Sequence, residues 1–222
     1  SVLAQVGQEE PGLQLQRTSP SIGAIFVRGV TGAKVVNYVD GIRFSNSAAR
    51  GGINSFFNTN DASNLRAVEV IRGPNSAQFG SDSIGGSVNL LSRPALYSDG
   101  GLEIHGLVST HFNSADYSFG GNSLVTFGGK DLSVLVNIAS HRSNTLRPGG
   151  GFDTHAAVNR FLGLRSDILD GERSTDTAFT QYGGLFKLNY RLTPKDQLSV
   201  HYQRAQIDGG KRFDQTLGGD GN

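Results

Sequence analysis

The sequence predicts a β-rich fold in which short strands alternate with glycine-rich turns. In many segments apolar side chains recur at every second position, which is the period of a β-strand with one buried face. Glycine supplies 31 of the 222 residues, about twice its usual share of about 7%, and the excess falls at turns and strand ends. No apolar run reaches the roughly 18 residues that a membrane-spanning helix needs.

The stretch 65–91, LRAVEVIRGPNSAQFGSDSIGGSVNLL, predicts two strands joined by a tight turn. Residues 65–72 alternate between two faces, and Gly73-Pro74 is a strong signal for the end of a strand. Closely spaced glycines then indicate a tightly folded backbone, and residues 87–91 alternate again. A phosphate-binding loop is excluded because Gly86 stands where such a loop needs lysine, and because a strand follows instead of a helix.

The residues before this stretch predict a short helix near the N-terminus and three strands joined by polar loops. The strands are expected at 13–16, 24–28 and 34–39. The loops are expected at 17–24 and 43–61, and Asp61 is expected to cap a single helical turn at its N-terminus.

The second half predicts five longer strands, each with an apolar and a polar side. They are expected at 102–112, 118–127, 132–141, 181–192 and 198–203. Tight turns at 128–131 and 193–196 contrast with a long polar loop at 143–177. Strands of about ten residues with this alternation are typical of outer-membrane β-barrels.

Composition and motifs exclude several functional classes. A net charge of +1 gives no general attraction for nucleic acid or an anionic membrane surface. The chain has no cysteine, which excludes disulfides, thiolate metal sites and cysteine nucleophiles. No hydrolase or protease signature is present, so we expect no catalytic residues and no enzymatic activity.

The five histidines show no metal-ligand spacing, so no metal site and no bound cofactor are predicted. His105, His141 and His201 fall on the polar strand faces, where solvation is the simplest interpretation. His111 and His155 are the candidates for a haem ligand. Acidic residues between 153 and 176 lack the spacing of a calcium loop and are expected to be solvated.

Four motifs in the first half resemble the plug domain of TonB-dependent outer-membrane transporters. In order along the chain they are PGL, FVRG, VNYVDGIR and the stretch 65–91. The resemblance covers residues 1–95 and implies an α+β plug domain there, followed over 96–222 by antiparallel transmembrane β-strands. Because five strands cannot close a barrel, it implies an N-terminal piece of a barrel of about 22 strands, without the energy-coupling TonB box that would precede the plug.

The resemblance also implies a function. The whole protein would lie in the bacterial outer membrane and take up a scarce small metal chelate, namely a ferric siderophore, haem or cobalamin. Its partners would be the TonB–ExbB–ExbD energy-coupling complex and outer-membrane lipid, with no role for nucleic acid.

Arginines at two motif positions, Arg28 and Arg72, are implied by the resemblance to lock the plug to glutamates on the barrel wall. A guanidinium–carboxylate pair suits this role because it is bidentate and directional. The alternative is that both are ordinary surface arginines. Glu69, on the same strand as Arg72, is grouped with this lock and is expected to form a salt bridge within the plug.

The resemblance makes the loops at 17–24 and 43–60 the plug apices that contact the ligand. The candidate residues are Arg17, Ser19, Ser21, Arg43, Phe44, Asn46, Arg50, Asn54, Phe56 and Phe57. The phenylalanines would stack on a flat or apolar ligand, or alternatively pack beneath the loop.

A soluble extracellular β-rich binding or adhesion domain is the alternative function. It also explains the alternating strands and glycine turns, but it needs a second sheet to cover the apolar faces of 182–192 and 198–202. The two hypotheses differ in whether the protein needs detergent to stay in solution.

Overall fold

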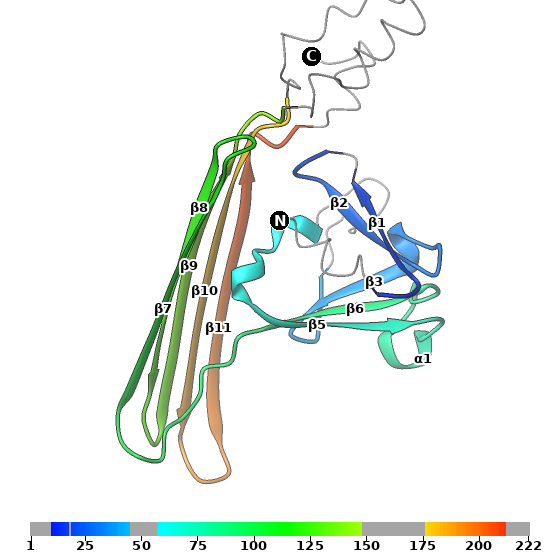
Figure 1. The fold of residues 1–222 in the computed structure, drawn as a ribbon. Helices are drawn as coiled ribbons and strands as arrows, with labels where there is room; N and C mark the ends of the chain where they lie inside the picture. Colours follow the sequence, from blue (N-terminus) through cyan, green and yellow to red (C-terminus); the bar gives the residue numbers. More distant parts are fainter. Residues whose placement is uncertain (1–9, 18, 45–56, 148–175, 212–222) are drawn as a thin grey trace, which may run out of the picture.

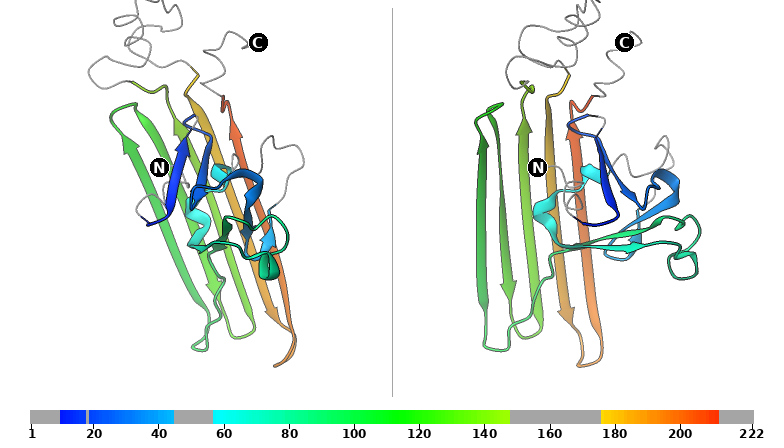
Figure 2. Two further views of the ribbon diagram at one scale, coloured as in Figure 1. Left: turned by 90° about the vertical axis from the view of Figure 1, so that its right-hand side faces the viewer. Right: turned by 45° about the vertical axis from the view of Figure 1, so that its right-hand side comes forward.

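A computed structural model describes residues 10–17, 19–44, 57–147 and 176–211 of the chain. These residues form two parts: a tall antiparallel sheet and a smaller mixed unit that lies against one of its faces (Figure 1). We call the first the wall sheet and the second, described from residue 10 to 93, the inner unit. Two further views show that the inner unit lies beside the middle of the wall strands (Figure 2).

The wall sheet contains five strands in the order β11-β10-β9-β8-β7, so that each strand pairs antiparallel with the next in the chain. The strands are β7 (Glu103–Asn113), β8 (Ser118–Gly128), β9 (Leu132–Ser143), β10 (Phe179–Arg191) and β11 (Gln197–Asp208). All five were predicted. β11 extends past the expected end at 203 because its pairing with β10 continues to Asp208, although Arg204 and Gln206 interrupt the apolar alternation.

The inner unit contains a two-stranded and a four-stranded sheet. β1 (Leu13–Arg17) pairs with β2 (Gly23–Val27), and the second sheet has the order β4-β3-β6-β5. Its strands are β3 (Val35–Val39), β4 (Ile42–Arg43), β5 (Leu65–Arg72) and β6 (Gly86–Ser92). β3 runs parallel to β6, whereas β5 is antiparallel to it. Short helical segments connect them: α1 (Ser76–Phe79), η2 (Gly32–Lys34), η4 (Phe57–Thr59) and η5 (Ala62–Asn64).

Buried aliphatic side chains from both sheets hold the inner unit together. Val27 and Val88 are fully buried, and they pack with Ile25, Val35 and Leu90. Burial of each such side chain contributes about 1.5–3 kcal/mol. The predicted strands at 13–16, 24–28, 34–39, 65–72 and 87–91 all occur with small shifts at their ends.

Four short elements of the inner unit, β4, α1, η2 and η4, were not predicted, and one expected helix lies largely outside the described residues. β4 and α1 occur where only turns and loops were expected, because two and four residues are too few to show a period. The capping role of Asp61 is confirmed: its carboxylate accepts a hydrogen bond from the Ser63 N–H at 2.7 Å. The short helix expected near the N-terminus falls largely outside the described residues.

The two faces of the wall sheet differ in character. The face turned away from the inner unit carries exposed large apolar side chains, among them Val108, Ile138, Tyr182 and Tyr202. On the opposite face Leu124, Leu135 and Leu185 are buried around Ala95, from the segment that links the two parts. None of the helices in the described part of the chain is sufficiently long and apolar to cross a membrane.

Candidate functional site between the inner unit and the wall sheet

An ionic contact centred on Asp40 joins the inner unit to the wall sheet. Asp40 follows β3 in the turn Asp40-Gly41 and adopts a φ of 49°. Its Oδ2 lies 3.3 Å from Lys187 Nζ on β10 and 3.3 Å from His201 Nδ1 on β11. The Asp40 carboxylate also accepts hydrogen bonds from the Ser92 N–H, at 2.8 Å, and from the Ser92 hydroxyl.

The surroundings of Asp40 favour its ionised form. Burial by itself raises the pKa of this carboxyl, but the hydrogen bonds from Ser92 and the positive charge of Lys187 outweigh it, so the pKa lies below its ordinary value. The side chains of Asp40 and Lys187 are only 21% and 15% exposed, so water screens their attraction incompletely. Asp40 is therefore a charged link between the two parts at neutral pH.

A pH dependence follows from this lowered pKa. A group whose pKa is depressed in the folded state stabilises the fold above its unfolded pKa and loses that effect as pH falls through the folded pKa. We expect the difference in unfolding free energy of the inner unit between the wild type and Asp40→Asn to shrink as pH falls below about 4. Denaturant unfolding at several pH values measures it, and a difference that persists undiminished at about pH 2 would contradict the prediction.

Side-chain amides form a second contact between the two parts, nearer than Lys187 to the start of β10. Asn137 Nδ2 on β9 donates to Asn64 Oδ1 at 2.8 Å and to Ser63 Oγ at 3.1 Å. Gln181 Nε2 on β10 donates to the backbone carbonyl of Asn58 at 2.9 Å. Directed polar contacts of this kind hold the inner unit in a defined position against the wall sheet.

A glycine on β10 allows a close approach of the two parts. A Cβ atom at Gly183 would lie 2.6 Å from Cβ of Asp61, the residue that caps η5. Real Cβ atoms do not approach this closely, so the wall is shaped to receive this turn of the inner unit. The sequence showed Gly183 only as part of a strand.

Arg28 and Arg72, the two arginines of the lock hypothesis, lie close together on the inner unit. Cγ of Arg28 and Cδ of Arg72 are each 3.9 Å from the Cβ position of Gly12. Arg72 Nη2 lies 3.1 Å from Glu10 Oε2, within the inner unit. The ends of β2 and β5 that carry the arginines lie on the side remote from the wall sheet (Figure 1), and neither arginine pairs with a described wall carboxylate.

Glu69 forms a hydrogen bond in place of the expected salt bridge. Its Oε2 accepts from Asn89 Nδ2 at 3.3 Å. It has no ion pair with any residue that the structure describes.

The predicted ligand-contacting residues differ in their surroundings. Ser19 and Ser21 are buried, and their hydroxyls hydrogen bond to each other at 3.1 Å, so they hold the shape of their loop. Arg17 Nη2 donates to a loop carbonyl, that of Pro20, at 3.4 Å. Arg43 Nη2 lies 2.8 Å from Asp82 Oδ2. Arg43 and the half-buried Phe44 also line a cavity of about 600 Å³, to which residues of β11 contribute.

The remaining apex candidates fall at or beyond the edge of the described chain. Phe57 begins η4. Asn46, Arg50, Asn54 and Phe56 lie outside the described residues, as does His155.

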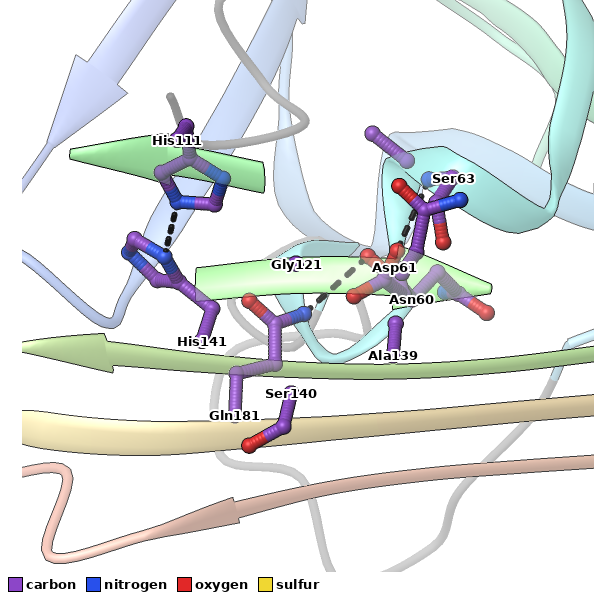
Figure 3. A pocket seen from close by; sticks show the side chains of 11 residues that line it. Asn60, Asp61, Ser63, His111, Gly121, Ala139, Ser140, His141 and Gln181 are labelled. Atoms are coloured by element: carbon purple, nitrogen blue, oxygen red, sulfur yellow. Dashed lines mark hydrogen bonds between the residues drawn. The ribbon is translucent and has the colours of Figure 1, made fainter. Parts of the chain in front are cut away.

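Two histidines meet on the inner face of the wall sheet, which sequence reasoning missed. His111 Nε2 on β7 lies 2.5 Å from His141 Nδ1 on β9, and the rings stack with centroids 4.6 Å apart (Figure 3). They border a cavity of about 400 Å³ that is also lined by Gln181, the neighbour of His141 on β10, and by Asn60 and Asp61 of the inner unit. The residues are 30 positions apart, so only the strand register reveals their contact.

Comparisons with known proteins give a consistent picture. Residues 1–87 match the family described as the TonB-dependent receptor plug domain. The chain is 29% identical over 150 residues, 66% of its length, to the vitamin B12 transporter BtuB of Vibrio cholerae. It is 34% identical over 118 residues, 52% of its length, to BtuB of Vibrio vulnificus. The chain spans only 22% and 19% of these relatives, respectively.

Solved structures share the fold over nearly the whole chain. The FrpB iron transporter from Neisseria meningitidis matches with a TM-score of 0.71 at 17% identity, covering 93% of this chain and 29% of that one. The copper transporter OprC matches with a TM-score of 0.66 at 13% identity, covering 90% and 27%. A mutant of the ferric enterobactin receptor PfeA from Pseudomonas aeruginosa matches with a TM-score of 0.62 at 21% identity, covering 98% and 33%.

Proposed function

Because this chain carries the plug domain of the TonB-dependent receptors and its strands fold as in those receptors, we propose that the whole protein is an outer-membrane receptor for active uptake. In this proposal the inner unit closes the lumen of a barrel whose first strands are the wall sheet. We place the boundary between plug and barrel near residue 95. The wall would continue beyond these five strands to about 22.

The arrangement of polar and apolar faces carries this proposal. The wall sheet turns exposed apolar side chains outward and meets the inner unit through Asp40, Asn64 and their partners. An apolar outer band with a polar interior is the pattern of outer-membrane barrels. A soluble adhesion domain would need a second sheet over the apolar face, and none covers it among the described residues.

The ligand proposed is a small metal chelate: a ferric siderophore, haem or cobalamin. Support comes from relatives named for vitamin B12 and from structural neighbours named for iron, copper and ferric enterobactin. The apex loops at 17–24 and 43–60 are proposed to contact it. Arg28 and Arg72, grouped with Glu69, are proposed to lock the plug to wall residues beyond this chain.

Energy coupling supplies the test of this proposal. The TonB–ExbB–ExbD complex is proposed to drive movement of the plug, so uptake of one of these three chelates should require TonB. We expect cells that express the whole protein to accumulate the chelate when TonB is present and to bind it without accumulation when TonB is absent. Cells without the receptor are the control, and equal accumulation with and without TonB would contradict the proposal.

A further inference from the structure

His111 and His141 come into contact across the strand β8 because the residue of β8 that lies between them is a glycine. Gly120 on β8 pairs with His111 on one side and with His141 on the other. A Cβ atom at Gly120 would lie 2.5 Å from His111 Cε1 and 2.7 Å from His141 Nδ1. The absence of a side chain at Gly120 therefore makes room for both rings above β8.

The ring geometry suits two ligands of one metal ion. Two nitrogens that bind one ion at about 2.0–2.1 Å stand about 2.9–3.4 Å apart. The two nitrogens are 2.5 Å apart here, so a small rotation of either ring reaches this range. Edge contact with Phe179, at 6.3 Å between ring centroids, helps to place the His141 ring. Axial ligation of one haem by both residues does not fit, because that requires imidazoles on opposite faces of the porphyrin.

The surroundings favour a cation with open coordination positions. The cavity beside the rings is also lined by the carboxylate of Asp61 and the side-chain amide of Asn60 from the inner unit, and by the side-chain amide of Gln181, which pairs with His141 on the neighbouring strand β10 (Figure 3). Carboxylate and amide oxygens that line the same cavity can accept hydrogen bonds from water bound to the metal. Within the described residues there is no group of three or more histidine, cysteine or acidic side chains arranged for a metal, so these two imidazoles would be the protein ligands.

We propose that His111 and His141 bind a divalent transition-metal cation of the Cu²⁺ or Zn²⁺ class on the inner face of the wall. Imidazole is a preferred ligand of these ions, and Cu²⁺ is bound most tightly among the first-row divalent cations. This inference goes beyond the proposed transport function, because it concerns the free metal and requires neither TonB nor a chelate.

The test uses Cu²⁺ alone with the purified whole receptor in detergent micelles. Electron paramagnetic resonance should show a Cu²⁺ signal coupled to two imidazole nitrogens in the wild type. His141→Ala should remove that signal and weaken Cu²⁺ binding at this site about a hundredfold, because only one of the two imidazole ligands remains. Gly120→Ala should do the same while it retains both imidazoles, since the added methyl group separates the rings.

His105→Ala is the matched control, because His105 lies on the same face of β7 and its side chain is 73% exposed. It should leave the two-nitrogen signal unchanged. The proposal is overturned if wild type and His141→Ala bind Cu²⁺ equally, or if His105→Ala causes the same loss. Should Gly120→Ala fail to assemble into the barrel, His111→Ala takes its place beside His141→Ala.

Discussion

Replacing Asp40 with asparagine should destabilise the docked inner unit by about 3 kcal/mol, because it leaves Lys187 partly buried without its counter-charge. The same substitution weakens the two hydrogen bonds from Ser92, which tie the turn after β3 to the end of β6. Amide hydrogen exchange in β3 and β6 of the whole protein should accelerate about a hundredfold, as about 1.4 kcal/mol corresponds to a factor of ten.

Asp82→Asn is the matched control for this prediction. It removes the same charge from the same unit, but the Asp82 and Arg43 side chains are 53% and 42% exposed. Exposed pairs of this kind contribute about 0–1 kcal/mol. Equal acceleration in the two variants would show that the Asp40 contact with the wall has no special role in holding the inner unit.

The fold was predictable from sequence because the alternation of apolar residues is a local signal. Residues 65–72 and 132–141 show it over many positions, and both are strands at the predicted places. The signal fails for β4 and α1, which are shorter than the window in which a period is visible. Their formation depends on neighbours instead: β4 pairs with the end of β3, and the carbonyl of Phe79 in α1 accepts a hydrogen bond from the Tyr38 hydroxyl at 2.5 Å.

The contacts of the candidate site were less predictable because they join residues far apart in the chain. Asp40 belongs to the motif VNYVDGIR, but its partners Lys187 and His201 lie about 150 positions later, within the expected strands at 181–192 and 198–203. The meeting of His111 and His141 depends on the register of three strands and on Gly120 between them. Alternation assigns a residue to a face, but it leaves undetermined which residue stands beside it.

Gly86→Ala should cause the largest loss of stability, because Gly86 is enclosed by backbone. A Cβ atom there would lie 2.2 Å from the carbonyl oxygen of Ile71 and 3.0 Å from Cγ1 of the fully buried Val27. Its φ of 150° is also a conformation that residues with a side chain rarely adopt. The added methyl group must push β5 from β6, and we expect a cost of about 4 kcal/mol.

Hydrogen exchange of the β5 and β6 amides in the whole protein measures this loss, with an expected acceleration of about a thousandfold. Gly29→Ala is the control for the backbone conformation alone, because Gly29 has a φ of 76° and no atom within 4 Å of its Cβ position. It should cost about 1–2 kcal/mol. An equal or smaller loss of stability in Gly86→Ala than in Gly29→Ala would contradict the prediction. It would mean that β5 and β6 can separate at the pair Arg72 and Gly86 without destabilising the inner unit.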